Sequence, residues 1–169
     1  SSLQARVQML KETLPDPASA VTLLNRSLAE RCPAGKFITF FYALLNPTDG
    51  TLTYSNAGHN YPLLIRADGS VKKLAGGGIV LGLFQMARYE MHQVTLEAGD
   101  MLALYSDGVT EAVDPAGEEF GEDRLAAFFW ERRSANCTTL VSELVDYLRG
   151  WHGSNAFSDD FTIVLVRRA

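Results

Sequence analysis

One stretch of the chain constrains its fold more than any other, because an apolar segment runs directly into an acid. Leu102–Tyr105 has the composition of a buried strand, and Ser106, Asp107 and Gly108 follow at once. A carboxylate at the end of a buried strand is held by a stiff element, and a neighbouring glycine allows close approach of another group. This arrangement is suited to presenting an acid to a metal ion or a substrate.

A second acidic segment lies far along the chain, where Asp159 and Asp160 precede the strand-like residues Thr162–Val166. If the two strands are antiparallel neighbours, Asp107 and Asp159 lie at the same edge of a sheet. Oxygen ligands of this kind bind hard cations such as Mg²⁺ and Mn²⁺. Each segment also has an ordinary structural interpretation: Asp-Gly is a common turn, and Asp159-Asp160 could be a solvated loop or a cap. Periodicity does not decide between these interpretations.

Composition limits the class of protein. With 169 residues, of which 47% are hydrophobic, we expect a single globular domain. The formal charge of −5 and a pI near 5.2 argue against a nucleic-acid partner or an anionic membrane surface. No apolar run is long enough to span a membrane, and the two cysteines lack a CxxC spacing. We therefore expect a cytoplasmic protein with free thiols and no zinc site.

The order of the predicted elements is two helices, a run of antiparallel strands, two helices and one last strand, which indicates an α+β fold. Periodicity predicts helices over residues 1–14, over a segment capped by Asp16, and over about 122–132 and 138–148. Gly76–Gly78 lacks the context of a phosphate-binding loop, so we interpret it as a turn. The remaining predicted strands are Phe37–Leu45, Thr51–Ser55, Tyr61–Arg66, Val71–Leu74 and Arg88–Leu96.

Several stretches, spread over nearly the whole chain, match one known family in order and spacing. They are Phe37–Ala43, Leu52–Asn60 followed by Pro62–Leu64, Gly78–Leu83, Leu104–Ala112, Phe120–Gly121 and Asp159–Thr162. In these stretches the chain resembles the bacterial metal-dependent serine/threonine phosphatases of the PPM superfamily, in the branch of stage II sporulation protein E and the sigma-factor-regulating phosphatases. The resemblance implies two antiparallel sheets packed face to face as a sandwich, flanked by helices. It also implies a pair of Mg²⁺ or Mn²⁺ ions at one end of the sandwich.

The same resemblance implies roles for particular residues. Asp107 and Asp159 would be catalytic metal ligands, with Gly108 beside them at the metal. Asp160 would support the ligand next to it. Glu111 could help an outer metal or brace the loop, and we favour bracing. The implied reaction is the hydrolysis of phosphoserine or phosphothreonine by a metal-activated water, without a protein nucleophile. The implied partner is a phosphorylated regulatory protein such as an anti-sigma-factor antagonist.

Two departures from the family pattern affect these expectations. Eukaryotic-type relatives carry an aspartate for a third metal where this chain has His59. We favour a turn in which side chains of Asn56–Asn60 bond the backbone near the site, over metal ligation or substrate contact by His59. The family's first metal-binding aspartate, which precedes the first helix, is absent, so we expect a phosphatase domain that lacks its N-terminal strands and is inactive or weakly active by itself.

Two rival interpretations remain. The chain could be a catalytically inactive regulatory or dimerisation module, and the helix predicted over residues 1–14 could pair with a second copy in a homodimer. Alternatively, it could be an unrelated α+β ligand-binding domain in which both acids are turn residues.

Overall fold

The computed structural model describes residues 16–30, 36–152 and 160–169. The helix predicted over residues 1–14 lies outside the described residues. Contacts divide the chain into two compact units, unit 1 (residues 1–59 and 75–96) and unit 2 (residues 60–74 and 97–169). The organisation of residues 1–169 as one phosphatase domain stays a prediction.

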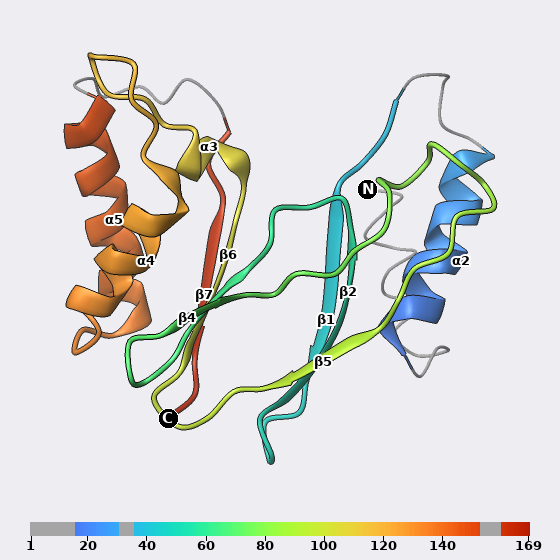
Figure 1. The fold of residues 1–169 in the computed structure, drawn as a ribbon, viewed down its shortest axis with the longest axis horizontal. Helices are drawn as coiled ribbons and strands as arrows, with labels where there is room; N and C mark the ends of the chain where they lie inside the picture. Colours follow the sequence, from blue (N-terminus) through green and yellow to red (C-terminus); the bar gives the residue numbers. More distant parts are fainter. Residues whose placement is uncertain (1–15, 31–35, 153–159) are drawn as a thin grey trace. The chain divides into compact units, whose positions relative to one another are not determined.

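Unit 1 contains a three-stranded antiparallel sheet in the order β1-β2-β5 and one described helix, α2 (Figure 1). The first two strands form the predicted hairpin, in which Phe40 lies opposite Ala57 and Leu45 lies opposite Leu52. The elements are α2 (Pro17–Ala29), β1 (Phe40–Leu45), β2 (Thr51–Ala57) and β5 (His92–Thr95).

Helix α2 begins where local sequence chemistry predicts. The side chain of Asp16 accepts a hydrogen bond of 2.8 Å from the Ser19 N–H, and Pro17 occupies the first helical position. This hydrogen bond lowers the pKa of the Asp16 carboxyl. The buried face of the helix presents Val21 and Leu24 to the apolar cluster of unit 1. Capping and burial thus fix both the start of α2 and the face it turns inward.

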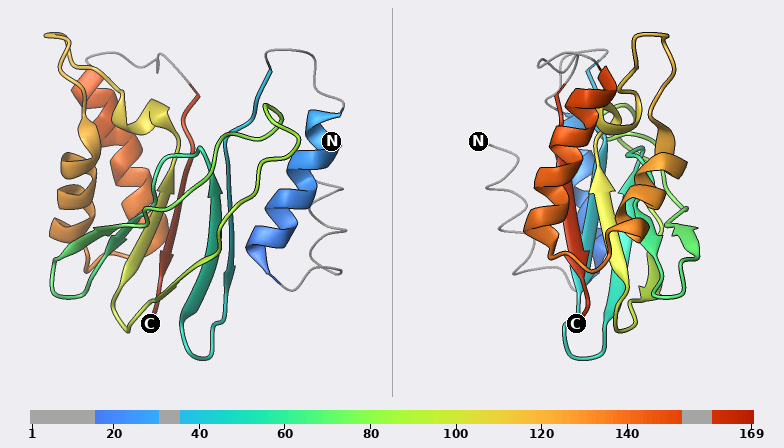
Figure 2. Two further views of the ribbon diagram at one scale, coloured as in Figure 1. Left: turned by 45° about the vertical axis from the view of Figure 1, so that its right-hand side comes forward. Right: turned by 90° about the vertical axis from the view of Figure 1, so that its left-hand side faces the viewer.

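Unit 2 contains a four-stranded antiparallel sheet in the order β4-β3-β6-β7. Helices α4 and α5 lie against one side of this sheet (Figures 1 and 2). Strand β6 is central, and it pairs with β7 from Met101 opposite Arg167 to Tyr105 opposite Ile163. The elements are β3 (Leu63–Ile65), β4 (Val71–Lys73), β6 (Met101–Tyr105), α3 (Asp107–Thr110), α4 (Gly121–Glu131), α5 (Cys137–His152) and β7 (Ile163–Arg167).

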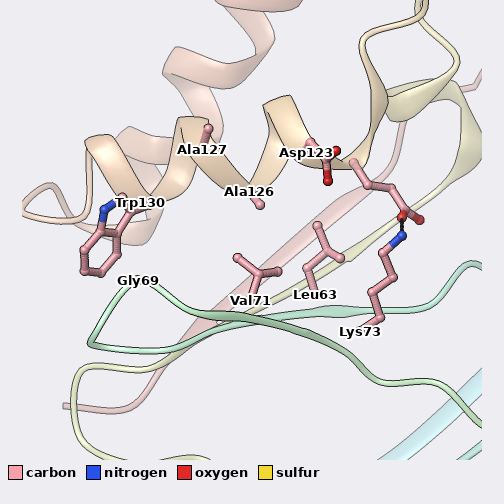
Figure 3. Close-up of a pocket in the computed structure, with 9 residues that line it drawn as sticks. Leu63, Gly69, Val71, Lys73, Asp123, Ala126, Ala127 and Trp130 are labelled. Carbon is pink, nitrogen blue, oxygen red and sulfur yellow. Dashed lines mark ion pairs between the residues drawn. The ribbon is translucent and has the colours of Figure 1, made fainter.

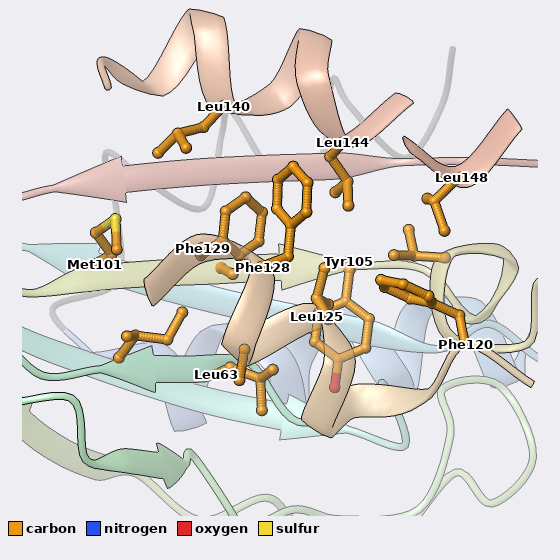
Figure 4. Close-up of a cluster of buried hydrophobic side chains, with 14 of the residues drawn as sticks. Leu63, Met101, Tyr105, Phe120, Leu125, Phe128, Phe129, Leu140, Leu144 and Leu148 are labelled. Atoms are coloured by element: carbon orange, nitrogen blue, oxygen red, sulfur yellow. The ribbon is translucent and has the colours of Figure 1, made fainter. Parts of the chain in front are cut away.

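The core of unit 2 lies between the sheet and the two helices (Figure 4). Leu125 and Phe129 of α4, with Leu140 and Leu144 of α5, are completely buried there. Burying each side chain of this size stabilises the fold by about 1.5–3 kcal/mol relative to leaving it exposed, so the packing of the two helices stabilises the position of β6. Strand β6, which leads into Asp107, is therefore supported by the apolar cluster of unit 2.

The α+β fold class with two antiparallel sheets is confirmed, while several element boundaries were wrong. Strand β1 begins at Phe40 because Phe37 is 57% exposed and Ile38 forms only an isolated bridge with Leu81. The strand predicted over residues 88–96 is reduced to His92–Thr95, and β2 extends beyond its predicted end to Ala57. None of the described helices is long and apolar enough to cross a bilayer.

Candidate functional site

Asp107 is the first residue of a short helix that follows β6 directly. Ser106 precedes the helix in extended backbone geometry. The Gly108 N–H donates to Asp107 Oδ1 at 2.9 Å, and the Glu111 N–H donates to the Asp107 carbonyl at 2.8 Å. The Asp107 carboxylate is solvent-exposed. The sequence did not reveal this short helix, but the acid is presented at the end of a buried strand as expected.

The strand partner of β6 brings the second acidic segment to the same edge of the sheet. Beyond the last paired residues, the Ser106 N–H donates to the Thr162 carbonyl at 3.0 Å. The Ser106 hydroxyl accepts a 2.9 Å hydrogen bond from the Thr162 N–H and donates to the Asp160 carbonyl at 3.1 Å. This antiparallel pairing was the condition on which the predicted site depended, and it is confirmed. Asp159 lies outside the described residues, so its approach to Asp107 stays a prediction.

The donor chemistry at this edge fits a hard cation. The Asp107 carboxylate forms no ion pair within the described part of the chain. Carboxylate oxygen is the donor that Mg²⁺ and Mn²⁺ prefer. Among residues 16–30, 36–152 and 160–169, no three His, Cys, Asp or Glu side chains are grouped to hold a metal. Metal roles for Asp107, Gly108 and Asp159, the supporting role of Asp160, and the role of the exposed Glu111 stay predictions.

Asn56 and His59 form a tight turn in unit 1. The Asn56 side chain is buried, its Oδ1 accepts from the His59 N–H at 2.8 Å, and its Nδ2 donates to the His59 carbonyl at 2.9 Å. Gly58 has a φ of +69°, and a Cβ there would lie 2.5 Å from Val80 Cγ1. The turn that we favoured is thus present, and the Asn56 side chain holds its backbone. A role for Asn56 or His59 beside a metal stays a prediction.

A hydrogen-bonded network that the sequence interpretation missed anchors the end of β6. The Tyr105 hydroxyl lies 2.6 Å from Glu122 Oε1 and 3.0 Å from the Tyr61 carbonyl, and Glu122 also forms an ion pair with Lys73. Burial and the neighbouring Glu122 raise the pKa of Tyr105 far above its ordinary value. Burial alone raises the pKa of Glu122, but hydrogen bonds from Lys73 and Tyr105 outweigh it and leave that pKa lowered. The network fixes the residue two positions before Asp107.

The same network closes one end of a cavity of about 300 Å³ between α4 and the strands β3 and β4 (Figure 3). Its walls are mainly apolar, and the ion pair between Lys73 and Glu122 lies at one end while Trp130 lies at the other. The lining residues come from segments far apart in the chain, so periodicity alone could not assemble them. They are Leu63, Gly69, Val71, Lys73, Glu122, Asp123, Ala126, Ala127 and Trp130.

Comparison with known proteins gives one family for the whole chain. The family model described as stage II sporulation protein E matches residues 1–169. The phosphoserine phosphatase RsbU of Bacillus subtilis is 32% identical over 169 residues, covering 99% of this chain and 50% of that protein. The chain therefore spans about half the length of this curated relative.

Two solved structures have the same fold. The SiaA-PP2C domain of Pseudomonas aeruginosa matches with a TM-score of 0.84 and 19% identity, covering 98% of this chain and 67% of that one. The phosphatase domain of SpoIIE from Bacillus subtilis, presoaked with manganese, matches with a TM-score of 0.63 and 19% identity, covering 98% of this chain and 72% of that one. At these identities the likeness concerns the fold.

Proposed function

This chain belongs to the stage II sporulation protein E family, and on that premise we propose that it is a metal-dependent protein serine/threonine phosphatase domain. The name of RsbU, a phosphoserine phosphatase, supports the reaction. The manganese in the related SpoIIE crystal supports the cofactor. The substrate would be a phosphoserine or phosphothreonine on a regulatory protein, of the kind that controls sigma factors.

The observation that carries this proposal is the double hydrogen bond of the Ser106 hydroxyl. It joins the residue before Asp107 to Asp160 and Thr162. The backbone next to Asp107 and the backbone of Asp160, the residue after Asp159 in the chain, are thereby hydrogen-bonded to one side chain. If Asp107 were only a turn residue, its neighbour Ser106 would not need hydrogen bonds to the distant residues Asp160 and Thr162.

The chain's own residues would position the reacting groups. The Gly108 N–H fixes the orientation of the Asp107 carboxylate, and Glu111 closes the short helix behind it through its backbone. Asp107 and Asp159 would hold the divalent ions, which when bound supply an activated water and neutralise phosphoryl oxygens. Asp160 would support Asp159 from the next position in the chain. Because the water is the nucleophile, no side chain needs to form a covalent intermediate.

Hydrolysis of a phosphoserine peptide by the full-length protein tests the proposal. We expect activity that requires Mn²⁺ and falls roughly 100-fold or more in Asp107→Asn and in Asp159→Asn, because each change removes a metal ligand. Asp146→Asn is the matched control, since Asp146 is an exposed acid of α5 that pairs with Arg149.

Two results would contradict the proposal. Activity that survives complete chelation of divalent ions would remove the role of the metal. Full activity in Asp107→Asn would make that residue a turn residue and favour the inactive or unrelated domain of the rival interpretations.

A further inference from the structure

We infer that a cavity beside α2 is a docking site for an acidic segment of a partner protein that also presents apolar side chains. The cavity and the apolar residues next to it, named here the α2 surface, belong entirely to unit 1. Asp107, Gly108 and Asp160, the described residues of the predicted metal site and its support, do not line it. The inference therefore goes beyond the proposed hydrolysis and does not depend on it.

The cavity has a volume of about 310 Å³ and lies between α2 and the segment that precedes β5. Figure 1 shows that segment running beside the helix. The buried Tyr89 lines the cavity, and burial raises the pKa of this residue to about 12. The lining residues are Ala18, Ser19, Thr22, Leu23, Arg26, Arg88 and Tyr89.

Two arginines give the cavity its charge. Arg26 and Arg88 are both exposed, line the same cavity, and form no ion pair within the described residues. Among the residues that the structure describes, no aspartate or glutamate lines the cavity, although the whole chain carries a formal charge of −5. A guanidinium group binds a carboxylate through two parallel hydrogen bonds. The cavity is thus complementary to a carboxylate.

Exposed apolar side chains next to the arginines indicate that the carboxylate belongs to a protein segment. Leu83, Phe84 and Met86 are 45%, 58% and 74% exposed within one short stretch, and Leu23 of the cavity wall is 46% exposed. Exposed apolar side chains that are grouped, unlike single ones, are typical of protein-interaction surfaces. A small anion would leave these side chains in water, whereas a segment with apolar residues beside its acid would cover them.

The α2 surface is held in shape before any partner binds. Asn25, which is completely buried, donates from Nδ2 to the Phe84 carbonyl at 2.8 Å and accepts at Oδ1 from the Gly82 N–H at 2.9 Å. Gln85 Nε2 also donates to Glu30 Oε1 at 3.1 Å. These bonds tie the apolar stretch to α2 at several points. A fixed surface of this kind loses less conformational entropy on binding than a flexible loop would.

Titration of the 169-residue chain with a synthetic peptide tests the inference. The probe is a peptide with two glutamates followed by two leucines and a phenylalanine, and its twin carries glutamines in place of the glutamates. Nuclear magnetic resonance would follow the side-chain Nε–H signals of Arg26 and Arg88 and the backbone amides of residues 83–86. We expect these signals to shift with the acidic peptide, with much weaker shifts for the twin and at 0.5 M salt.

Variants separate charge from packing. Each of Arg26→Gln and Arg88→Gln is expected to weaken binding about two- to fivefold, and the double variant roughly tenfold, since exposed pairs are individually weak. Met86→Gln should weaken binding about two- to fivefold without affecting the arginine signals of the free protein. The matched control is Lys36→Gln with Lys72→Gln, which removes two exposed positive charges elsewhere and should leave binding unchanged.

Three outcomes would overturn the inference. Equal binding of the acidic peptide and its twin would show that the arginines do not select a carboxylate. A loss of several degrees in melting temperature for the double arginine variant would mean that the arginines serve a contact inside the chain. Dissociation of a dimer by the same variant, seen by analytical ultracentrifugation, would make a second copy of this chain the occupant.

Discussion

Replacing Ser106 with alanine removes the hydroxyl group that joins the end of β6 to the residues before β7. That hydroxyl donates to the Asp160 carbonyl at 3.1 Å and accepts from the Thr162 N–H at 2.9 Å. A net intramolecular hydrogen bond contributes about 0.5–1.5 kcal/mol. Because Asp160 and Thr162 are exposed, water can replace the lost partner, so the low end of that range applies. The expected loss is about 1–2 kcal/mol for the two bonds together.

Two measurements on Ser106→Ala check this reasoning. For a chain of this length, a loss of 1 kcal/mol lowers the melting temperature by about 2–4 °C, so calorimetry should show a fall of about 2–8 °C. In the full-length protein, the Kd for Mn²⁺ should rise roughly tenfold, as when a supporting hydrogen bond behind a ligand is lost. Ser106→Thr keeps the hydroxyl and should restore most of both properties.

The control for this variant is Ser70→Ala. Ser70 donates a 2.7 Å hydrogen bond to Asp68 Oδ1 in an exposed turn of the same unit, so its loss should leave Mn²⁺ affinity unchanged. If Ser106→Ala lowers the melting temperature but changes the Kd for Mn²⁺ less than twofold, the hydroxyl only stabilises the fold. The reasoning that it aligns the two acidic segments would then be wrong.

Three further predictions concern the hydrogen-bonded groups. Tyr105→Phe should cost about 1–3 kcal/mol in urea unfolding, because Glu122 loses a hydrogen-bond donor; a cost below about 0.5 kcal/mol would contradict this. The pKa of Glu122 is lowered from its ordinary value of 4.5, so its interactions stabilise the fold above that pH and are lost as the pH falls. The difference in stability between wild type and Glu122→Gln should therefore be constant near neutral pH and shrink below about pH 4.5; an increase there would refute it. Asn56→Ala should cost about 2–3 kcal/mol, because the His59 N–H and carbonyl lose their partner, and a urea midpoint equal to wild type would count against it.

Much of the fold was predictable because local rules govern it. The cap at Asp16, the start of α2 at Pro17 and the β1–β2 hairpin all follow from neighbouring residues. The antiparallel pairing of β6 with β7 could be stated only as a condition, because sequence periodicity carries no information on which strands are neighbours. The helix α3 was missed since four residues are too few to display a helical period.

The hydrogen-bond partners of the buried polar groups were harder to predict, although the position of one group in the sequence indicated that it needed a partner. Asn25 lies four residues after Val21, so it falls on the apolar face of α2 where a polar residue needs a partner. Its partners near Phe84 are about sixty positions away, and nothing local identifies them. The hydrogen bond between Tyr105 and Glu122 was also not predictable from local sequence, because the two residues meet only when α4 packs on the sheet.

The division of the chain into interleaved units has a consequence for its synthesis and its proteolysis. The chain passes from one unit to the other after residues 59, 74 and 96. Strand β5 must join β2 after β3 and β4 have left the ribosome, so translation cannot complete the first unit before it begins the second. A protease that cuts once between the units leaves at least one of them covalently incomplete. We expect the sheet of unit 1 to become resistant to digestion once residue 96 has left the ribosome, and the sheet of unit 2 only after its last strand, β7, has followed.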